Sequence, residues 1–410
     1  MIHIVSNRKK LAVVLVCLGI LWLAAAISEA GTVPYVAPAA WSPDGSKVAI
    51  VVNSSVEVRD AATTQVLYVL DGHTDLVPMV AWSPDSSMIA TPSYDQTVKL
   101  WSASDGTLLH TLSGHNAYVT TVVWSPDGTR LFSWGFDTSP NLFVWDVVTG
   151  ALLSQHNSGT IVAAAFSPDG QRLALSSSLS FGIIDGVSLN PIAQSPRVVC
   201  CANQMYSIAW SPDGNTLVTG SINGLVTLWD AHTAQILKQF EANPHYASDA
   251  RDVDNLALSW IRAVTFGPNG SSILAVSGDG SVREWDSATG TLIQDTRITP
   301  LFTAVWSPYG GRLAVWGPTA QNATALSNEQ AFDASTGEFT IVVPVSSLER
   351  LQAIASACNA PSAIRESLTT GIQADQLTTF VAQLEALPEG TIPPACADDL
   401  IAVAQTLQSQ

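Results

Sequence analysis

The stretch AWSPDG at residues 40–45 recurs along the chain, and its recurrence decides the fold. Further copies read AWSPDS from Ala81, VWSPDG from Val123, AFSPDG from Ala165 and AWSPDG from Ala209, and weaker copies read TFGPNG from Thr265 and VWSPYG from Val305. The Trp or Phe of successive copies lies 40–44 residues apart, with one longer interval of 56 residues. A period of about 40–45 residues indicates a protein built from stacked repeats.

The unit from Val77 to His115 shows what one repeat forms. It divides into four β-rich runs, 77–83, 88–94, 97–103 and 107–113, which tight-turn compositions separate. Four short antiparallel strands make one small sheet, and such a sheet buries its two faces only when copies stand radially around an axis. The sequence therefore predicts an all-β, seven-bladed propeller over residues 31–344, with 338–343 as the fourth strand of the last unit.

Two further landmarks recur in register with the hexapeptide. A Trp near the end of the third strand is Trp101 in the second unit and is followed by Asp at Trp145, Trp229 and Trp285. Gly-His pairs end at His73 and His115. With these landmarks in register, the chain resembles the WD40 repeat family over about residues 33–344.

The resemblance implies a hydrogen-bonded network of His, Ser or Thr, Asp and Trp inside each blade, with a structural role. The matching residues are His73, Ser93, Asp95 and Trp101 in the second unit, His115, Asp137 and Trp145 in the third, where Gly135 replaces the hydroxyl, and Ser277, Asp279 and Trp285 in the sixth. The fifth unit carries Ser221, Asn223 and Trp229 at these positions.

The first thirty residues have the composition of a targeting segment. Arg8, Lys9 and Lys10 precede the uncharged apolar run 11–27, and Ser-Glu-Ala follows at 28–30. This pattern predicts a signal peptide over 1–30 or an uncleaved membrane anchor through 11–27. Either alternative predicts a location outside the cytoplasm, secreted or periplasmic or membrane-anchored.

After Pro344 the hydrophobic period changes to that of helices. The segments 346–358, 361–370, 374–387 and 395–408 carry apolar residues at i, i+3, i+4 and i+7, which predicts a small helical bundle over 345–410. Cys358 and Cys396 lie on its first and last helical segments, and we expect a disulfide between them because it would stabilise a small core. The adjacent Cys200 and Cys201 are either free thiols or a vicinal pair.

Insertions in the repeat indicate a binding face. The segments 191–204, 241–259 and 318–329 all extend connections on one face of the ring, called the top, where second strands lead into third strands and fourth strands into first strands. Large side chains expected on that face are Tyr35, Leu76, Tyr94, Tyr118, Phe136 and Trp260. They either contact a protein partner or pack beneath the insertions or the bundle. Because both chain ends leave from the top, we expect the bundle to cap or flank this face.

Composition and motifs narrow the function. The 17 Lys and Arg against 34 Asp and Glu give a net charge of −17, which argues against a nucleic-acid partner. No catalytic motif stands out, so we expect no enzyme activity, metal or cofactor. The first hypothesis is a protein-binding scaffold outside the cytoplasm. The alternatives are an extracytoplasmic enzyme or small-ligand binder using the central channel, and a module whose bundle binds while its propeller is a spacer.

Overall fold

The computed structural model describes residues 39–137, 139–157, 161–176, 180–195, 205–241, 261–267, 270–277, 280–297, 303–308, 311–318, 337–342, 348–369, 374–388 and 390–408. Several residues singled out in the sequence lie outside these ranges, namely the segment 1–30, Tyr35, Cys200, Cys201, Trp260 and Asp279.

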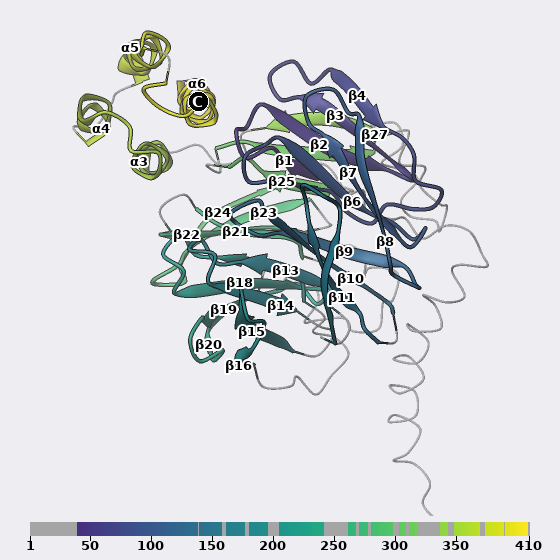
Figure 1. Ribbon diagram of the computed structural model, residues 1–410. Coiled ribbons are helices and arrows are strands. Elements are labelled where there is room, and N and C mark those ends of the chain that lie inside the picture. Colours follow the sequence, from purple (N-terminus) through teal and green to yellow (C-terminus); the bar gives the residue numbers. More distant parts are fainter. Residues whose placement is uncertain are drawn as a thin grey trace, which may run out of the picture.

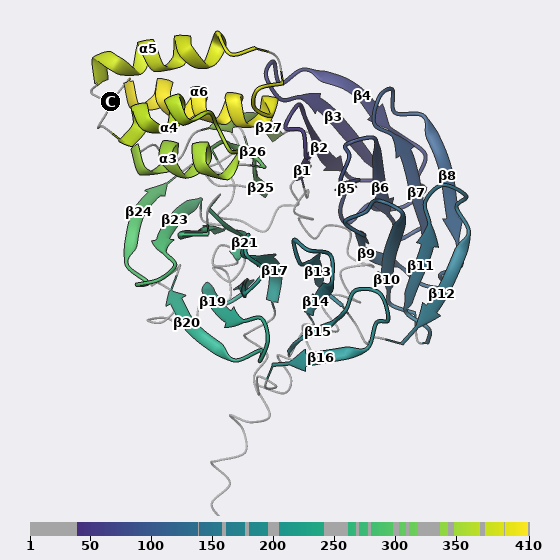
Figure 2. The same ribbon diagram turned by 60° about the vertical axis from the view of Figure 1, so that its left-hand side comes forward.

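Antiparallel sheets stand around a common axis, with each sheet's strands in chain order from the centre to the rim (Figure 2). Among the described residues, six sheets have four strands and the seventh has three. This arrangement confirms the β-propeller, and the helices that follow it confirm the predicted C-terminal helical segments (Figure 1).

The strands of the first four sheets have the following bounds. The first sheet contains β1 (Ala39–Trp41), β2 (Lys47–Val52), β3 (Ser55–Asp60) and β4 (Val66–Leu70). The second contains β5 (Ala81–Trp82), β6 (Met88–Pro92), β7 (Thr97–Ser102) and β8 (Leu108–Ser113). The third contains β9 (Val119–Trp124), β10 (Arg130–Gly135), β11 (Leu142–Asp146) and β12 (Leu152–His156). The fourth contains β13 (Ala163–Phe166), β14 (Arg172–Ser176), β15 (Phe181–Asp185) and β16 (Pro191–Gln194).

The remaining three sheets complete the ring. The fifth contains β17 (Met205–Trp210), β18 (Thr216–Ser221), β19 (Leu225–Asp230) and β20 (Ile236–Glu241). The sixth contains β21 (Ile261–Phe266), β22 (Ser272–Ser277), β23 (Ser281–Asp286) and β24 (Leu292–Arg297). The seventh contains β25 (Thr303–Trp306), β26 (Leu313–Pro318) and β27 (Gly337–Val342).

In the second, third and fifth sheets the Trp of the recurring hexapeptide joins the sheet to the one before it. The indole Nε1 of Trp82 donates to the Ala40 carbonyl at 2.9 Å, across the boundary between the first and second sheets. Trp124 donates in the same way to Ala81 at 3.2 Å, and Trp210 donates to Ala165 at 2.8 Å. Apolar side chains of neighbouring sheets fill the rest of each boundary, so the core of the propeller lies between the sheets.

The inner strand of the second sheet is shorter than predicted. β5 contains two residues, whereas the equivalent β9 contains six. Pro78 occupies the position that Thr120 has in β9, and a proline has no N–H to donate to the adjacent strand. The predicted run 77–83 pairs with β6 only at Ala81 and Trp82.

The prediction that 338–343 forms the fourth strand of the seventh sheet is wrong. The segment 338–343 is not a fourth strand, because β27 pairs directly with β26, with Leu313 opposite Val342 and Pro318 opposite Gly337. β27 therefore runs antiparallel to β26 and ends beside the turn between β25 and β26. The chain leaves the sheet on the bottom face, which carries the turns between first and second strands.

Four described helices follow, α3 (Leu348–Ala357), α4 (Ser362–Thr369), α5 (Ala374–Glu385) and α6 (Pro394–Gln408). They enclose a core of their own, which includes Leu351, Phe380 and Leu400. A disulfide joins Cys358, just after α3, to Cys396 in the first turn of α6. α6 begins at a proline, whose fixed φ and missing N–H suit a first helical position.

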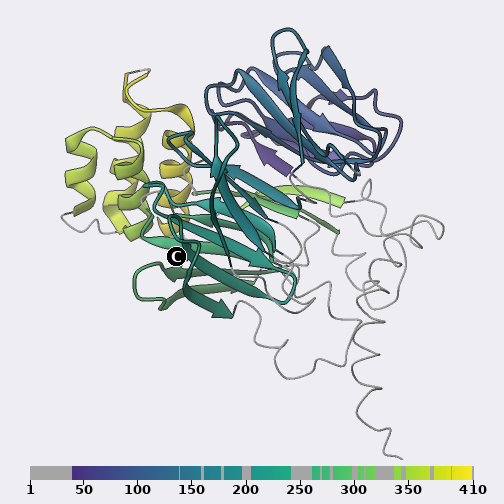
Figure 3. The ribbon, with the colours of Figure 1, turned by 60° about the horizontal axis from the view of Figure 1, so that its bottom comes forward.

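The bundle lies on the bottom of the propeller, and the expectation that it caps or flanks the top is wrong. A side chain at Gly45, in the first turn of the first sheet, would collide with Ala395 of α6. The hydroxyl of Ser307, in the corresponding turn of the seventh sheet, donates to Asp399 of α6. Figure 3 shows the helices together on one side of the propeller. The chain reaches this side because β27 is a third strand rather than a fourth.

Candidate protein-interaction surface

A buried network fixes the top of the second sheet. The indole Nε1 of Trp101 donates to the Thr91 hydroxyl at 2.8 Å, and Thr91 Oγ1 lies 2.8 Å from His73 Nε2. His73 Nδ1 lies 2.7 Å from Asp95 Oδ2. Since a carboxylate only accepts, Nδ1 carries the proton and Nε2 accepts from Thr91. The chain of bonds ties the loop before β5 to the turn between β6 and β7.

The environment keeps this imidazole neutral. Burial lowers the pKa of His73, against the opposing effect of the hydrogen bond to Asp95. Burial acts to raise the pKa of Asp95, but hydrogen bonds from Thr97 and His73 outweigh it and lower the pKa on balance. With the pKa of both groups lowered, a neutral His73 stands beside an ionised Asp95 at pH 7, and this pair fits the hydrogen bonds described.

The third sheet repeats the arrangement. His115 Nδ1 lies 2.5 Å from Asp137 Oδ2, and the Ser133 hydroxyl lies 2.8 Å from both His115 Nε2 and Trp145 Nε1. Burial lowers the pKa of His115, and this imidazole is also neutral. The Asn116 amide donates to Asp137, so the network holds the loop before β9 against the turn after β10.

The hydroxyl of each network is not the one predicted. Thr91 and Ser133 supply it, nine residues after the hexapeptide Trp, whereas Ser93 donates to the Asp75 carbonyl and accepts from the Asp95 amide. Thr91 lies two residues from Ile89, which is opposite Trp101, so alternation places Thr91 on the same face as the indole. The nine-residue spacing was a signal present in the sequence.

Gly135, which was predicted to replace the network hydroxyl of the third unit, has a different role. A Cβ there would lie 2.6 Å from Asp137 Oδ2 and 2.7 Å from the Tyr118 carbonyl. The glycine therefore permits the close approach of the loop and the turn above the buried network. Ser133 keeps the third network complete.

The fifth and sixth sheets keep less of the network. Trp229 Nε1 donates to Thr219 Oγ1 at 2.9 Å, and the Ser221 hydroxyl bonds within its own turn, to Asn223 and the Leu225 carbonyl. In the sixth sheet Ser277 and Trp285 are buried, and Ala275 occupies the position of Thr91. In the fifth sheet Asn223 stands where the second and third sheets have the network Asp, and in the sixth sheet Asp279 lies outside the described residues.

The networks position a row of large side chains on the top face, which we call the top-face row: Leu76, Tyr94, Tyr118 and Phe136. The Tyr94 amide donates to the Leu76 carbonyl at 2.9 Å, and the Phe136 amide donates to the Tyr118 carbonyl at 3.0 Å. The rings of Tyr94 and Tyr118 stack with 4.6 Å between centroids and 13° between planes. Tyr118 is 44% exposed and Phe136 is 54% exposed.

The bundle does not cover this row. The row belongs to the loops before β5 and β9 and the turns after β6 and β10, at the ends of the strands opposite the turns that α6 contacts. Packing beneath the bundle is therefore excluded, and the insertions beneath which these side chains were also expected to pack lie largely outside the described residues. Tyr35 and Trp260, expected on the same face, lie outside the described residues.

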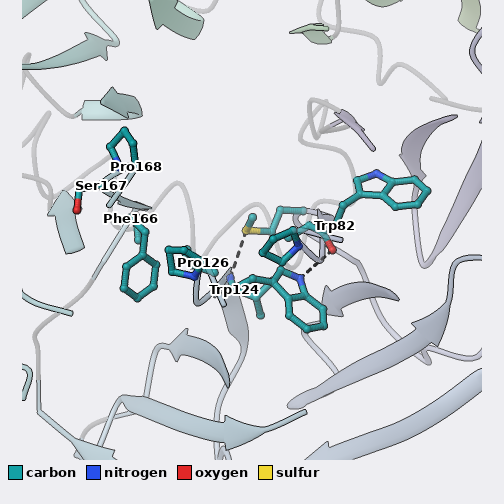
Figure 4. A pocket seen from close by; sticks show the side chains of 12 residues that line it. Trp82, Trp124, Pro126, Phe166, Ser167 and Pro168 are labelled. Carbon is teal, nitrogen blue, oxygen red and sulfur yellow. Dashed lines mark hydrogen bonds between the residues drawn. The ribbon is translucent and has the colours of Figure 1, made fainter. Parts of the chain in front are cut away.

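A hollow of ≈ 490 Å³ opens at the bottom of the inner strands of the second to fourth sheets (Figure 4). The side chains labelled in the view include Trp82, Trp124, Phe166, Pro126 and Pro168. Carboxylates and histidines are missing from the twelve residues that line the hollow. Its chemistry is apolar and offers no group for acid–base or metal catalysis.

No group of three or more His, Cys, Asp or Glu is placed to hold a metal ion within the part of the chain that the structure describes. Within the same residues, each helix is too short or too polar to cross a bilayer.

Comparison with protein families identifies the repeats. The model of the WD domain, G-beta repeat, matches residues 64–102, 106–146, 195–230 and 257–286. The first match runs from β4 of one sheet to β7 of the next, and the second runs from β8 to β11. The sequence repeat is thus offset from the sheet by one strand, and each repeat links two neighbouring sheets.

Several characterised proteins are similar to parts of the chain. Protein HIR1 of Cryptococcus neoformans is 40% identical over 76 residues, which cover 18% of this chain and 9% of that protein. WD repeat-containing protein slp1 of Schizosaccharomyces pombe is 28% identical over 150 residues, 32% of this chain and 27% of that protein. A component of chromatin assembly factor 1 from the same yeast is 36% identical over 52 residues, 12% of this chain and 10% of that protein. The chain matches at most about a quarter of each of these relatives.

These relatives overturn one prediction, and the matched repeats support another. A location outside the cytoplasm is wrong, because the similar proteins include a factor named for the assembly of chromatin, which lies in the nucleus. The residues on which that prediction depended, 1–30, lie outside the described ranges. The matched repeats, the radial sheets and the His–Asp–Trp networks show that the chain carries WD40 repeats arranged as a β-propeller.

Proposed function

We propose that the chain is a non-enzymatic scaffold that binds a protein partner through the top-face row. The observation that carries this proposal is the stack of Tyr94 on Tyr118, continued by the exposed Phe136. Aromatic side chains that are held rigidly and remain exposed supply binding energy at a low cost in conformational entropy. The buried networks below hold these rings before any partner arrives.

The charge beside the row favours a partner with basic side chains. Asp75 precedes Leu76 in the chain, and both Asp71 and Asp75 are exposed. A lysine or arginine of the partner can lie over an aromatic face while a carboxylate accepts from it. Such binding weakens with salt, since exposed charges are screened beyond about 8 Å at physiological ionic strength.

The alternative of an enzyme or small-ligand binder in the central channel has less support. The hollow at the bottom of the inner strands is lined by Trp, Phe, Pro and aliphatic side chains, without carboxylates or histidines. Fold alone does not decide between scaffold and enzyme, since propellers serve both. The rigid exposed row favours the scaffold.

A capture experiment with three baits tests the proposal. Full-length chain, the Tyr118→Ala/Phe136→Ala variant and the Val148→Ala variant are immobilised, and proteins cross-linked from cells that produce the chain are identified. Val148 is the matched control, because it is apolar, 78% exposed and in the same sheet, but in the turn after β11 on the opposite face. A partner retained by Val148→Ala and lost from the double variant supports the proposal.

Two results would contradict it. A partner that all three baits capture equally binds elsewhere on the chain. A partner that all three baits capture and that cross-links to residues 348–408 would favour the bundle as the binding part, with the propeller as a spacer.

A further inference from the structure

Five sheets carry a carboxylate in the turn between first and second strands, and it serves the same two donors each time. A Ser hydroxyl donates to the Asp two residues later at 2.5–2.6 Å: Ser42 to Asp44, Ser83 to Asp85, Ser125 to Asp127, Ser167 to Asp169 and Ser211 to Asp213. The amide two residues after the Asp donates to the same oxygen at 2.9–3.1 Å: Ser46, Ser87, Thr129, Gln171 and Asn215. We call the hydroxyl and the amide the turn donors.

The seventh sheet has the turn donors but not the Asp. Its turn reads SPYGG from Ser307, so a Tyr stands at position 309 where the five turns have Asp. Asp399 of α6 supplies the missing group: its Oδ2 accepts from the Ser307 hydroxyl at 2.6 Å and from the Gly311 amide at 3.1 Å. The carboxylate is completely buried, and it comes from a residue 92 positions away in the chain from Ser307.

The neighbouring residues leave room for this substitution. A Cβ at Gly311 would lie 2.7 Å from the Asp399 Cβ, whereas all five other turns carry a side chain at this position. The glycine at 311 therefore permits the close approach of Asp399, and the Tyr at 309 leaves the turn without a carboxylate of its own. Arg312 completes the site, since its Nε donates to Asp399 Oδ1 at 2.7 Å.

The contact spans the junction at which the ring closes. Arg312 belongs to the seventh sheet, and its guanidinium carbon lies 4.9 Å from the ring centroid of Trp41 in the first sheet. Ala395 of α6 adjoins Gly45 of the first sheet. α6 therefore contacts both the last and the first sheets. These two sheets are neighbours in the ring but are not consecutive in the chain.

We propose that α6 closes the ring, with Asp399 acting as the turn carboxylate of the seventh sheet, so that bundle and propeller unfold as one unit. Removing Asp399 leaves the Ser307 hydroxyl, the Gly311 amide and the Arg312 guanidinium without their common acceptor, which is costly for buried groups. The inference is independent of the proposed function, because α6 and the top-face row lie on opposite faces.

A rescue experiment on the full chain tests it. Asp399→Ala is expected to lower the Tm by roughly 5–10 °C. Tyr309→Asp/Asp399→Ala returns a carboxylate to the turn itself, as in the five other sheets, and is expected to recover at least half of that loss. Asp398→Ala is the matched control, because this exposed neighbour only approaches Arg312 at 3.5 Å.

Each outcome of this experiment supports or overturns the inference that Asp399 closes the ring. A Tm of Asp399→Ala no lower than that of Asp398→Ala overturns the inference, as does a double variant no more stable than Asp399→Ala. If Asp399→Ala does not fold, a folded double variant supports the inference and an unfolded one overturns it. In Asp399→Ala, proteolysis within 394–408 is expected to speed up at least tenfold relative to Asp398→Ala.

Discussion

The rings of Tyr94 and Tyr118 stack across the boundary between the second and third sheets, with 4.6 Å between their centroids. Tyr94 directly precedes Asp95 in the sequence, and Tyr118 lies three residues after His115. Each tyrosine therefore belongs to a loop or turn that a buried network fixes. The networks are structural, but their effect reaches the surface, because they set the backbone from which both rings project. Stability of the blades and geometry of the top-face row are therefore coupled.

Replacing His115 by Ala should destabilise the propeller. The change removes the hydrogen-bond partner of both Asp137 and Ser133 in a buried site, and we expect a loss of about 2–4 kcal/mol. Urea unfolding followed by tryptophan fluorescence measures it. His156→Ala is the control, since this His is exposed in the same sheet and should cost less than about 0.5 kcal/mol. Equal losses in the two variants would mean that the network contributes nothing specific.

Stability should fall as the pH drops below about 6.5. Burial lowers the pKa of His73 and His115 in the folded chain from 6.5, so the unfolded chain binds more protons just below that pH. Stability is fully present above 6.5 and is lost as the pH falls toward the lowered folded values. The urea midpoint at pH 7.5 and pH 5.5 checks this. A His73→Ala/His115→Ala variant that loses as much between the two pH values as the natural chain would refute the assignment.

The bonds between sheets should each be measurable. Trp124→Phe removes the Nε1 donor to Ala81 while keeping an aromatic ring, and we expect a loss of about 1 kcal/mol. Trp82→Phe and Trp210→Phe remove equivalent bonds and should cost similar amounts. Phe already stands at this position in the fourth and sixth sheets, so the ring itself is tolerated. Three neutral variants would show that the bonds do not hold the sheets together.

Reduction should destabilise the bundle. The Cys358–Cys396 disulfide closes a loop with a sequence separation of 38, which corresponds to about 3–4 kcal/mol on the chain-entropy model. Thermal unfolding followed at 222 nm, with and without dithiothreitol, measures the loss of helix. A Cys358→Ala/Cys396→Ala variant should melt like the reduced chain and ignore the reductant. A helix signal that melts identically in oxidised and reduced chains would contradict the prediction.

Local patterns predicted the sheets and helices well. The hexapeptide anchors, from Trp41 to Trp306, mark the inner strand of every sheet, because each anchor ends a strand and begins a tight turn. The predicted helical segments overlap α3 to α6 closely, since apolar residues at helical spacing must share a face. Both signals depend on residues near one another in the chain.

Contacts between distant residues could not be predicted. Asp399 reaches Ser307 from α6, 92 positions away, and the sequence shows only an unexplained Tyr at position 309. The misplaced strand at 338–343 had a larger effect, because treating it as a fourth strand sent the bundle to the wrong face. The network hydroxyl was missed by two residues, since the position before the turn was chosen instead of the one facing the indole.

Hydrogen–deuterium exchange on partner binding tests the central claim most directly. Exchange in the full-length chain is measured with and without the partner that the full-length bait captures. Mass spectrometry reports which backbone amides become protected. The account predicts new protection in the loops and turns that carry Leu76, Tyr94, Tyr118 and Phe136, with the turn around Val148 unchanged. Protection confined to the bottom turns or to α3–α6, with the top-face row unaffected, would contradict it.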